Sequence, residues 1–179
     1  MALHSDSQEI PQQLQAQSNK AKSNVYVTVQ FGHNDQKPND TYKPTFLANL
    51  KRMANDVVTA GGHPILVTPL SRRNYFKNGT IEDILEPWAI YVRQAAATTN
   101  QPFIELLQTS ITYLNKIGKA AAMKLNYEEK DYTHLNENGK VIFGRMVADL
   151  IKAKNIISPS PFVVDAALSE QEAAGIPSF

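Results

Sequence analysis

The chain has 179 residues, of which 42% are hydrophobic and 20% are charged, and its formal net charge is +1. This length suits one domain with a substantial core and is short for two. The near-neutral charge argues against nucleic acid or an anionic membrane as the main partner, because both require a basic surplus or a basic patch. The chain has no cysteine, which excludes disulfides, thiol nucleophiles and thiolate metal sites.

The first twenty residues are polar and lack the apolar core of a signal peptide. No run of about 18 apolar residues indicates a transmembrane helix. Glycosylation acceptors at Asn39 and Asn78 hint at secretion only weakly, since such triplets arise by chance. The sequence therefore leaves the localisation of this chain open.

The first half of the chain alternates strand and helix patterns. Residues 1–24 are a polar, Gln-rich segment compatible with a short helix over 9–20. The run VYVTVQFG at 25–32 is β-branched with little alternation, which is typical of a parallel strand buried on both faces. After a polar loop, apolar residues recur every three or four positions between Pro44 and Val58 and predict a helix that stops at Gly61-Gly62. PILVTP at 64–69 predicts a second buried strand.

The second half continues this alternation. We expect a helix over 82–99, a strand at 102–106, a helix over 109–124, a polar loop at 125–136 and a last helix around 141–151. Residues 156–179 contain three prolines and no clear period, and are expected to be a tail. Strands alternating with helices predict an α/β fold with a parallel sheet covered on both faces. Ligands of such sheets bind outside the carboxyl ends of the strands, so the loops at 32–43, 70–81, 107–110 and 125–136 are the ones to examine.

Two clusters in these loops could carry chemistry. Gly32-His33-Asn34-Asp35 follows the first strand, and Asp131-Tyr132-Thr133-His134 precedes the last helix. A carboxylate three residues before a histidine can hold one imidazole nitrogen and leave the other as a general base, while an Asn amide can donate to an oxyanion.

Simpler interpretations remain open for each cluster. Asp-x-x-His before a helix is often a capping arrangement, and Gly-His-Asn-Asp suits a turn. A metal site formed by His33, Asp35, Asp131 and His134 is conceivable, although no ligand spacing supports it.

The stretches VTVQFGHNDQKP, LVTPLSRRNYF and DYTHLNENGK together resemble the later motifs of the Ser-Gly-Asn-His (GDSL-type) hydrolase superfamily, and most of all its rhamnogalacturonan acetylesterase branch. The resemblance covers roughly residues 24–153. It implies a flavodoxin-like three-layer α/β/α domain over 25–155, between the polar segment 1–24 and the tail 156–179.

The resemblance also implies residue roles. Asn34 would be an oxyanion-hole donor, His134 the general base and Asp131 the residue that orients it, with Gly32, His33 and Asp35 supporting the Asn34 loop. Arg72 and Arg73 match an arginine pair of this branch and would face the carboxylates of a pectic substrate, or else simply form part of a structural loop.

The family's Gly-Asp-Ser strand, which carries the nucleophile, and the strand after it cannot be found. Asp6-Ser7 echoes that motif, but too few residues separate Ser7 from Val25 for the intervening elements. The domain is therefore expected to be truncated at its N-terminus, with its first two strands missing and VYVTVQF left as an apolar edge. Since losing such a serine costs about 10⁶ in kcat in another serine hydrolase, the chain as written is expected to be nearly inactive.

The function predicted by this resemblance is removal of O-acetyl groups from pectic polysaccharide by serine acyl transfer. It implies no metal or organic cofactor, no nucleic-acid or membrane partner, and a secreted monomer when the protein is complete. The alternatives are a non-catalytic carbohydrate-binding remnant and a GDSL esterase or lipase of another specificity. An unrelated flavodoxin-like binding module is a further alternative, but no glycine-rich phosphate loop supports it.

Overall fold

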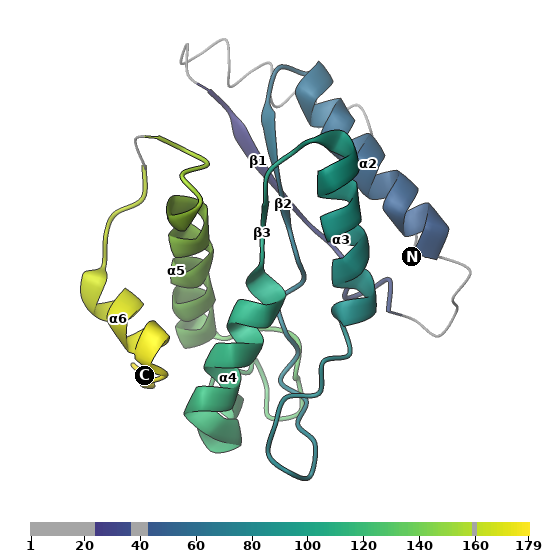
Figure 1. The fold of residues 1–179 in the computed structure, drawn as a ribbon. Helices are drawn as coiled ribbons and strands as arrows, with labels where there is room; N and C mark the ends of the chain where they lie inside the picture. Colours follow the sequence, from purple (N-terminus) through teal and green to yellow (C-terminus); the bar gives the residue numbers. More distant parts are fainter. Residues whose placement is uncertain (1–23, 37–42, 159–160) are drawn as a thin grey trace. The chain divides into compact units, whose positions relative to one another are not determined.

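The computed structural model describes residues 24–36, 43–158 and 161–179 (Figure 1). The chain forms two compact units. The first contains the described residues up to Pro69 together with Pro87–Phe103, and the second contains Leu70–Glu86 and Ile104–Phe179. The predictions made for the first 23 residues, including Ser7 and the helix over 9–20, and for Asn39 lie outside the described residues.

A parallel sheet of three strands confirms the predicted α/β class. Its strands are β1 (Tyr26–Gln30), β2 (His63–Val67) and β3 (Phe103–Ile104), in the spatial order β1-β2-β3. β1 and β2 run parallel, with Tyr26 opposite His63 and Gln30 opposite Val67. All three were predicted as strands from apolar runs, and each is shorter than its run.

Burial distinguishes the first two strands. β2 is buried from its second residue to its last, as expected for a strand with neighbours on both sides. β1 is the edge of the described sheet, and only Val29 among its residues is buried. The apolar run alone indicated burial on both faces, whereas the missing first two strands of the family predicted an edge strand. In the described structure β2 is the one strand neighbour of β1, as expected for an edge.

Two helices accompany these strands in the first unit, α2 (Lys43–Thr59) and α3 (Glu86–Thr99). The apolar stripe of α2 buries five residues at helical spacing, namely Phe46, Leu50, Met53, Ala54 and Val57. The Phe46 ring meets Trp88 of α3 edge-on, with ring centroids 5.1 Å apart. α3 starts four residues later than predicted, because Pro87 suits the first helical turn and the Asp83 carboxylate accepts from the Glu86 N–H.

The second unit holds α4 (Leu106–Met123), α5 (Glu137–Ala153) and α6 (Ala166–Ala174). α4 and α5 pack through apolar stripes, and the rings of Tyr113 and Phe143 meet edge-on at 6.2 Å. α6 lies within the segment predicted to be a tail. Only the two ends of this helix have residues typical of helix boundaries. Asp165 caps its start, and Gly175 ends it with a φ of 72°.

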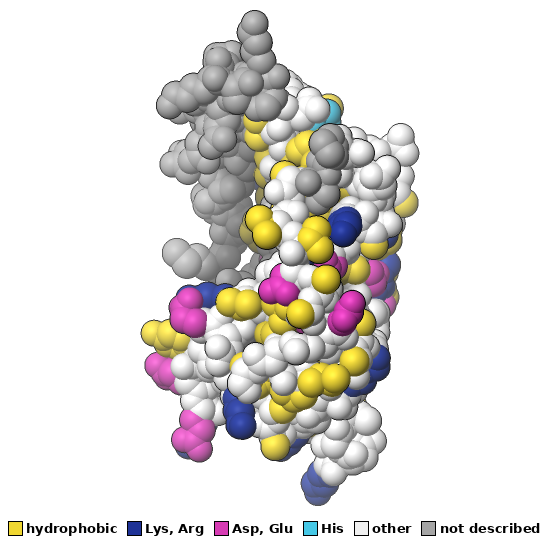
Figure 2. All heavy atoms as spheres, turned by 90° about the vertical axis from the view of Figure 1, so that its left-hand side faces the viewer, with side chains coloured by type: hydrophobic (Ala, Val, Ile, Leu, Met, Phe, Trp, Pro, Cys, Tyr) yellow, Lys and Arg dark blue, Asp and Glu magenta, His cyan; other side chains and the backbone are white. Residues whose placement is uncertain are grey.

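No helix in the described ranges is long and apolar enough to cross a membrane. On the face shown in Figure 2, acidic, basic and hydrophobic side chains are interspersed. The described part of that face therefore carries no extended field of a single charge sign, in keeping with the net charge of +1.

Candidate active site

The Asp131–His134 pair is formed in the second unit. The His134 Nδ1 atom lies 2.7 Å from Asp131 Oδ2, while Asp131 Oδ1 accepts hydrogen bonds from the backbone N–H groups of Thr133 and His134 at 2.9 and 2.8 Å. The carboxylate thus holds both the turn and the imidazole. The His134 side chain is 75% exposed, and within the described residues nothing bonds to its Nε2. That nitrogen is free to take a proton from a bound group.

The electrostatics of the pair keep the Asp131 carboxylate ionised at neutral pH. The two backbone N–H groups and the His134 ring lower the pKa of Asp131 to about 2. An ionised Asp131 accepts the Nδ1 proton, which fixes the tautomer with Nε2 unprotonated and ready to act as a base.

Residues on both sides of the pair hold it at the start of α5. Asn126 and Leu135 form an antiparallel bridge, and the Tyr127 N–H donates to the carbonyl of His134. Asn136 is the N-cap of α5, since its side-chain oxygen accepts from the Gly139 N–H at 3.0 Å. Asp131 therefore does not cap this helix, and the capping interpretation of Asp-x-x-His does not hold.

Arg73 supports the same turn from inside the protein. Its side chain is buried and donates to the Asn126 side-chain oxygen and, over 2.6 Å, to the backbone carbonyl of His134. Its backbone N–H donates to the carbonyl of Tyr132. Burial lowers the pKa of Arg73 to about 10, an effect that Asp131 and Tyr75 partly offset, so the guanidinium stays charged at neutral pH. This placement favours the structural role for Arg73.

Arg72 points to a different environment from its neighbour. It is half-buried, and its guanidinium donates to the hydroxyl of Thr133, which lies between Asp131 and His134 in the sequence. Burial lowers its pKa, and the charge of Asp131 opposes that shift. Of the two arginines, Arg72 is the one with a partly exposed side chain.

The other predicted cluster, Gly32 to Asp35, belongs to the first unit and forms a turn after β1. Gly32 has a φ of 131°, and a Cβ on it would lie 2.8 Å from Pro69 Cγ, so glycine is required there. Asn34 is exposed, as a donor to a ligand must be. Asp35 is half-buried, and burial raises the pKa of its carboxyl against the hydrogen bonds of backbone N–H groups. His33 is half-buried and has partners.

Within the described ranges, no three His, Asp or Glu side chains are grouped so that they could hold a metal ion. Asn126 was not predicted as part of the site. Its only sequence signal is its place at the start of the loop that carries the pair.

Comparison with known proteins identifies the family. The sequence model described as "GDSL-like Lipase/Acylhydrolase" matches residues 3–147, most of the chain. The chain belongs to the GDSL-like lipase/acylhydrolase family.

Two curated relatives come from Bacillus subtilis (strain 168). Rhamnogalacturonan acetylesterase RhgT is 32% identical over 153 residues, which are 78% of this chain and 66% of RhgT. Probable rhamnogalacturonan acetylesterase YesY is 29% identical over 147 residues, which are 78% of this chain and 67% of YesY. The chain thus spans about two thirds of these relatives.

Solved structures show the same fold. Protein YxiM from Bacillus subtilis matches with a TM-score of 0.69 and 24% identity, over 80% of this chain and 41% of that protein. The acetylxylan esterase Axe2 from Geobacillus stearothermophilus matches with a TM-score of 0.55 and 20% identity, over 79% of this chain and 67% of that protein. The GDSL-type fold predicted from the three motifs is therefore confirmed.

Proposed function

We propose that this chain carries the acid–base half of an acetylesterase that removes O-acetyl groups from an acidic polysaccharide. The observation that carries the proposal is the 2.7 Å contact between His134 Nδ1 and Asp131 Oδ2, with Nε2 exposed. The names of the curated relatives, both rhamnogalacturonan acetylesterases, support this substrate class.

The proposed mechanism is acyl transfer in two steps. His134 Nε2 takes the proton of a serine hydroxyl as that oxygen attacks the acetyl carbonyl, and the imidazolium formed is stabilised by the Asp131 carboxylate. An oxyanion develops on the carbonyl oxygen and accepts a hydrogen bond from the Asn34 amide. The proton then passes to the departing sugar oxygen. The same histidine then deprotonates a water molecule that attacks the acetyl-serine, and the imidazolium returns the proton to the serine oxygen as acetate leaves.

The nucleophile is the part of this mechanism that the described residues do not supply. No Gly-Asp-Ser motif can be read in the 179 residues, and Ser7 lies outside the described ranges. We therefore expect these 179 residues alone to hydrolyse esters slowly, with His134 activating water directly in place of a serine.

Substrate recognition is assigned to Arg72. A guanidinium binds carboxylates in two parallel hydrogen bonds, and galacturonate supplies a carboxylate beside the acetylated sugar. Arg73 is too deeply buried for this role. Because pectic polysaccharide is an extracellular polymer, we infer that the whole protein acts outside the cell. No metal or organic cofactor takes part in the proposed steps.

Acetate release from acetylated rhamnogalacturonan tests the proposal. We expect slow hydrolysis that falls by about 10²-fold or more in His134→Ala, since a general base contributes 10²–10⁴-fold. Ser7→Ala is the matched control and should leave the rate unchanged. Each variant is first checked for one cooperative unfolding transition.

Other results would revise the assignment. Fast hydrolysis lost in Ser7→Ala would identify Ser7 as the nucleophile. Hydrolysis unaffected by His134→Ala would refute the proposed base. A folded chain that binds the polysaccharide but never releases acetate would support the carbohydrate-binding alternative.

A further inference from the structure

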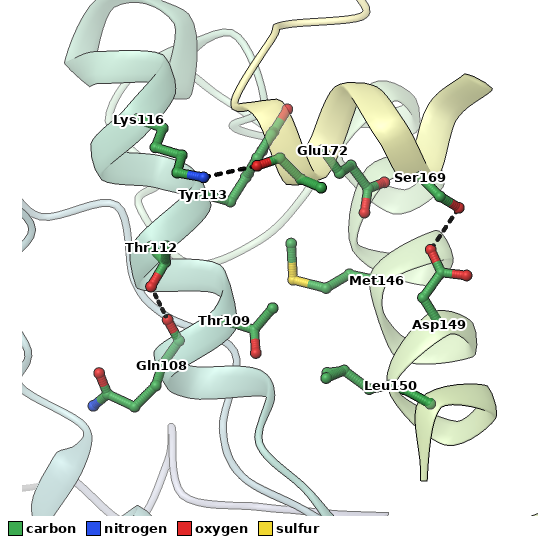
Figure 3. A pocket seen from close by; sticks show the side chains of 12 residues that line it. Gln108, Thr109, Thr112, Tyr113, Lys116, Met146, Asp149, Leu150, Ser169 and Glu172 are labelled. Atoms are coloured by element: carbon green, nitrogen blue, oxygen red, sulfur yellow. Dashed lines mark hydrogen bonds between the residues drawn. The ribbon is translucent and has the colours of Figure 1, made fainter. Parts of the chain in front are cut away.

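A cavity of about 470 Å³ lies in the second unit among α4, α5 and α6 (Figure 3). Neither Asp131 nor His134 lines it. This volume is within the range of small-molecule sites. Exposed side chains at its rim, including Gln108, Thr112 and Lys116, open it to solvent. Its interior is mostly apolar, with Met146 and Leu150 of α5 on one side.

Two buried polar atoms of this cavity have no hydrogen-bond partner among the described residues. They are the hydroxyl of Tyr113 on α4 and the Oε1 atom of Glu172 on α6. Tyr113 is 2% exposed and Glu172 is 8% exposed, so bulk water does not readily satisfy them. Buried polar groups are almost always hydrogen-bonded, and those left unpaired beside a cavity call for a partner inside it. Both atoms can accept a hydrogen bond.

The charges around Glu172 favour a cationic partner. Asp149 of α5 and Asp165 before α6 both act on it with negative charge, and Arg145 is the opposing positive charge. Arg145 is already paired with Asp149 at 2.6 Å. The ammonium group of Lys116 on α4 donates a hydrogen bond of 2.7 Å to the carbonyl of Ala173.

The protonation behaviour of the two groups agrees with this field. Burial, followed by the charge of Asp149, raises the pKa of Glu172 to about 8. Burial and the charge of Glu172 raise the pKa of Tyr113 to about 12. Both groups therefore remain protonated at pH 7, and a bound cation would favour release of the Glu172 proton.

We propose that this cavity binds a small organic cation, a primary alkylammonium ion. Its N–H groups donate to the Glu172 carboxylate and the Tyr113 hydroxyl, and its alkyl part lies against Met146 and Leu150. The site is independent of the proposed esterase chemistry, because it uses none of the residues assigned to that reaction. The Asp149 carboxylate disfavours an anion of the same size, and a neutral alcohol does not favour ionisation of Glu172 as a cation does.

Methyl NMR of the 179-residue chain labelled at methionine tests the site. Butylammonium chloride is titrated at pH 7, with butan-1-ol and sodium butyrate as probes of the same length but different charge. We expect a saturable shift of the Met146 methyl signal with butylammonium, at least 10-fold weaker binding of butan-1-ol and none of butyrate. The methyl of Met53, in the core of the first unit, should not move.

Two variants that conserve volume test the assigned acceptors. Glu172→Gln should weaken butylammonium binding at least 10-fold, and Tyr113→Phe should weaken it several-fold. Raising the pH from 6 to 9 should strengthen binding to the unaltered chain, because Glu172 ionises while the amine stays charged. Butan-1-ol binding as tightly as butylammonium, or full affinity in both folded variants, would overturn the proposal. So would the absence of a saturable Met146 shift.

Discussion

Arg73 donates a hydrogen bond of 2.6 Å to the backbone carbonyl of His134, the residue whose imidazole forms the proposed base. A third contact, at 3.5 Å, reaches the carbonyl of Asp131. A buried guanidinium thus holds both ends of the Asp131–His134 turn by their backbone. The imidazole can be highly exposed and still keep a defined position, because its backbone is fixed from within.

Arg73→Met is predicted to destabilise the fold and to loosen this turn. Methionine keeps most of the volume but leaves the Asn126 oxygen without its donor and removes one of the two donors to the His134 carbonyl, at a cost of about 2 kcal/mol. Urea unfolding measures this loss. Arg72→Met is the matched control and should lose less than about 1 kcal/mol, because Arg72 is half-buried. Equal losses in the two variants would contradict the structural role of Arg73.

Asp131 is predicted to stabilise the fold at neutral pH and to lose this contribution in acid. Its pKa of about 2 in the folded protein lies below the unfolded value of about 4, so its contribution is present above pH 4 and is lost as the pH falls toward 2. Asp131→Asn should be less stable than the unaltered chain at pH 6, and this difference should shrink toward pH 2. Urea midpoints at a series of pH values measure it. A difference that is constant from pH 6 to 2 would show that the carboxylate charge is not involved.

The sequence predicts helices best where an apolar stripe faces a core. The stripe of α2 from Phe46 to Val57 located that helix within a few residues, and the buried run of β2 located its strand. α6 was not predicted because its one buried residue is the acidic Glu172, so its packing leaves no apolar period. The composition of β1 alone indicated burial on both faces, because composition does not reveal how many neighbours a strand has; its edge position was expected only from the missing family motifs.

The sequence likewise predicted some residues of the candidate site and missed others. Asp131 and His134 were predicted as a pair because a carboxylate three residues before a histidine can hold its ring, and the structure forms this contact. The structural role of Arg73 was not predicted. The sequence does not distinguish which of two adjacent arginines in a polar loop has its side chain buried in the core. Asn126, the partner of Arg73, lies 53 residues away in sequence, a distance over which local patterns carry no information.

Gly32→Ala is predicted to distort the turn that carries Asn34. The new Cβ would approach Pro69 Cγ to 2.8 Å, and the φ of 131° is unfavourable for alanine. Strain and overpacking together should cost about 2–4 kcal/mol. Gly79→Ala separates the two effects, because Gly79 has a φ of 84° with nothing within 4 Å of the new Cβ. We expect it to cost only about 1 kcal/mol in thermal or urea unfolding, and equal costs would contradict the clash at Gly32.

Glu172 is predicted to make the fold less stable as the pH rises. Its folded pKa of about 8 exceeds the unfolded value of about 4.5, so the folded state binds more protons and stability falls between these two pH values. The loss should be of the order of 2 kcal/mol, because water at the cavity rim screens part of the effect. Glu172→Gln removes the titrating group and should flatten this slope. Urea unfolding from pH 5 to 9 measures the pH dependence of the unfolding free energy in the unaltered chain and in the variant. The same pH dependence in both would exclude Glu172 as its source.

Arg72→Ala is predicted to change substrate preference more than turnover. If the Arg72 guanidinium binds a uronate carboxylate, its loss should raise KM for acetylated rhamnogalacturonan about 10-fold, which corresponds to one charge-assisted hydrogen bond. Acetylated xylan with its uronic-acid branches removed carries no such carboxylate and is the matched substrate, for which KM should not change. Steady-state acetate release measures both parameters. An equal rise in KM for both substrates would mean that Arg72 acts through Thr133 on the shape of the Asp131–His134 turn, since the side chains of Arg72 and Thr133 are hydrogen-bonded.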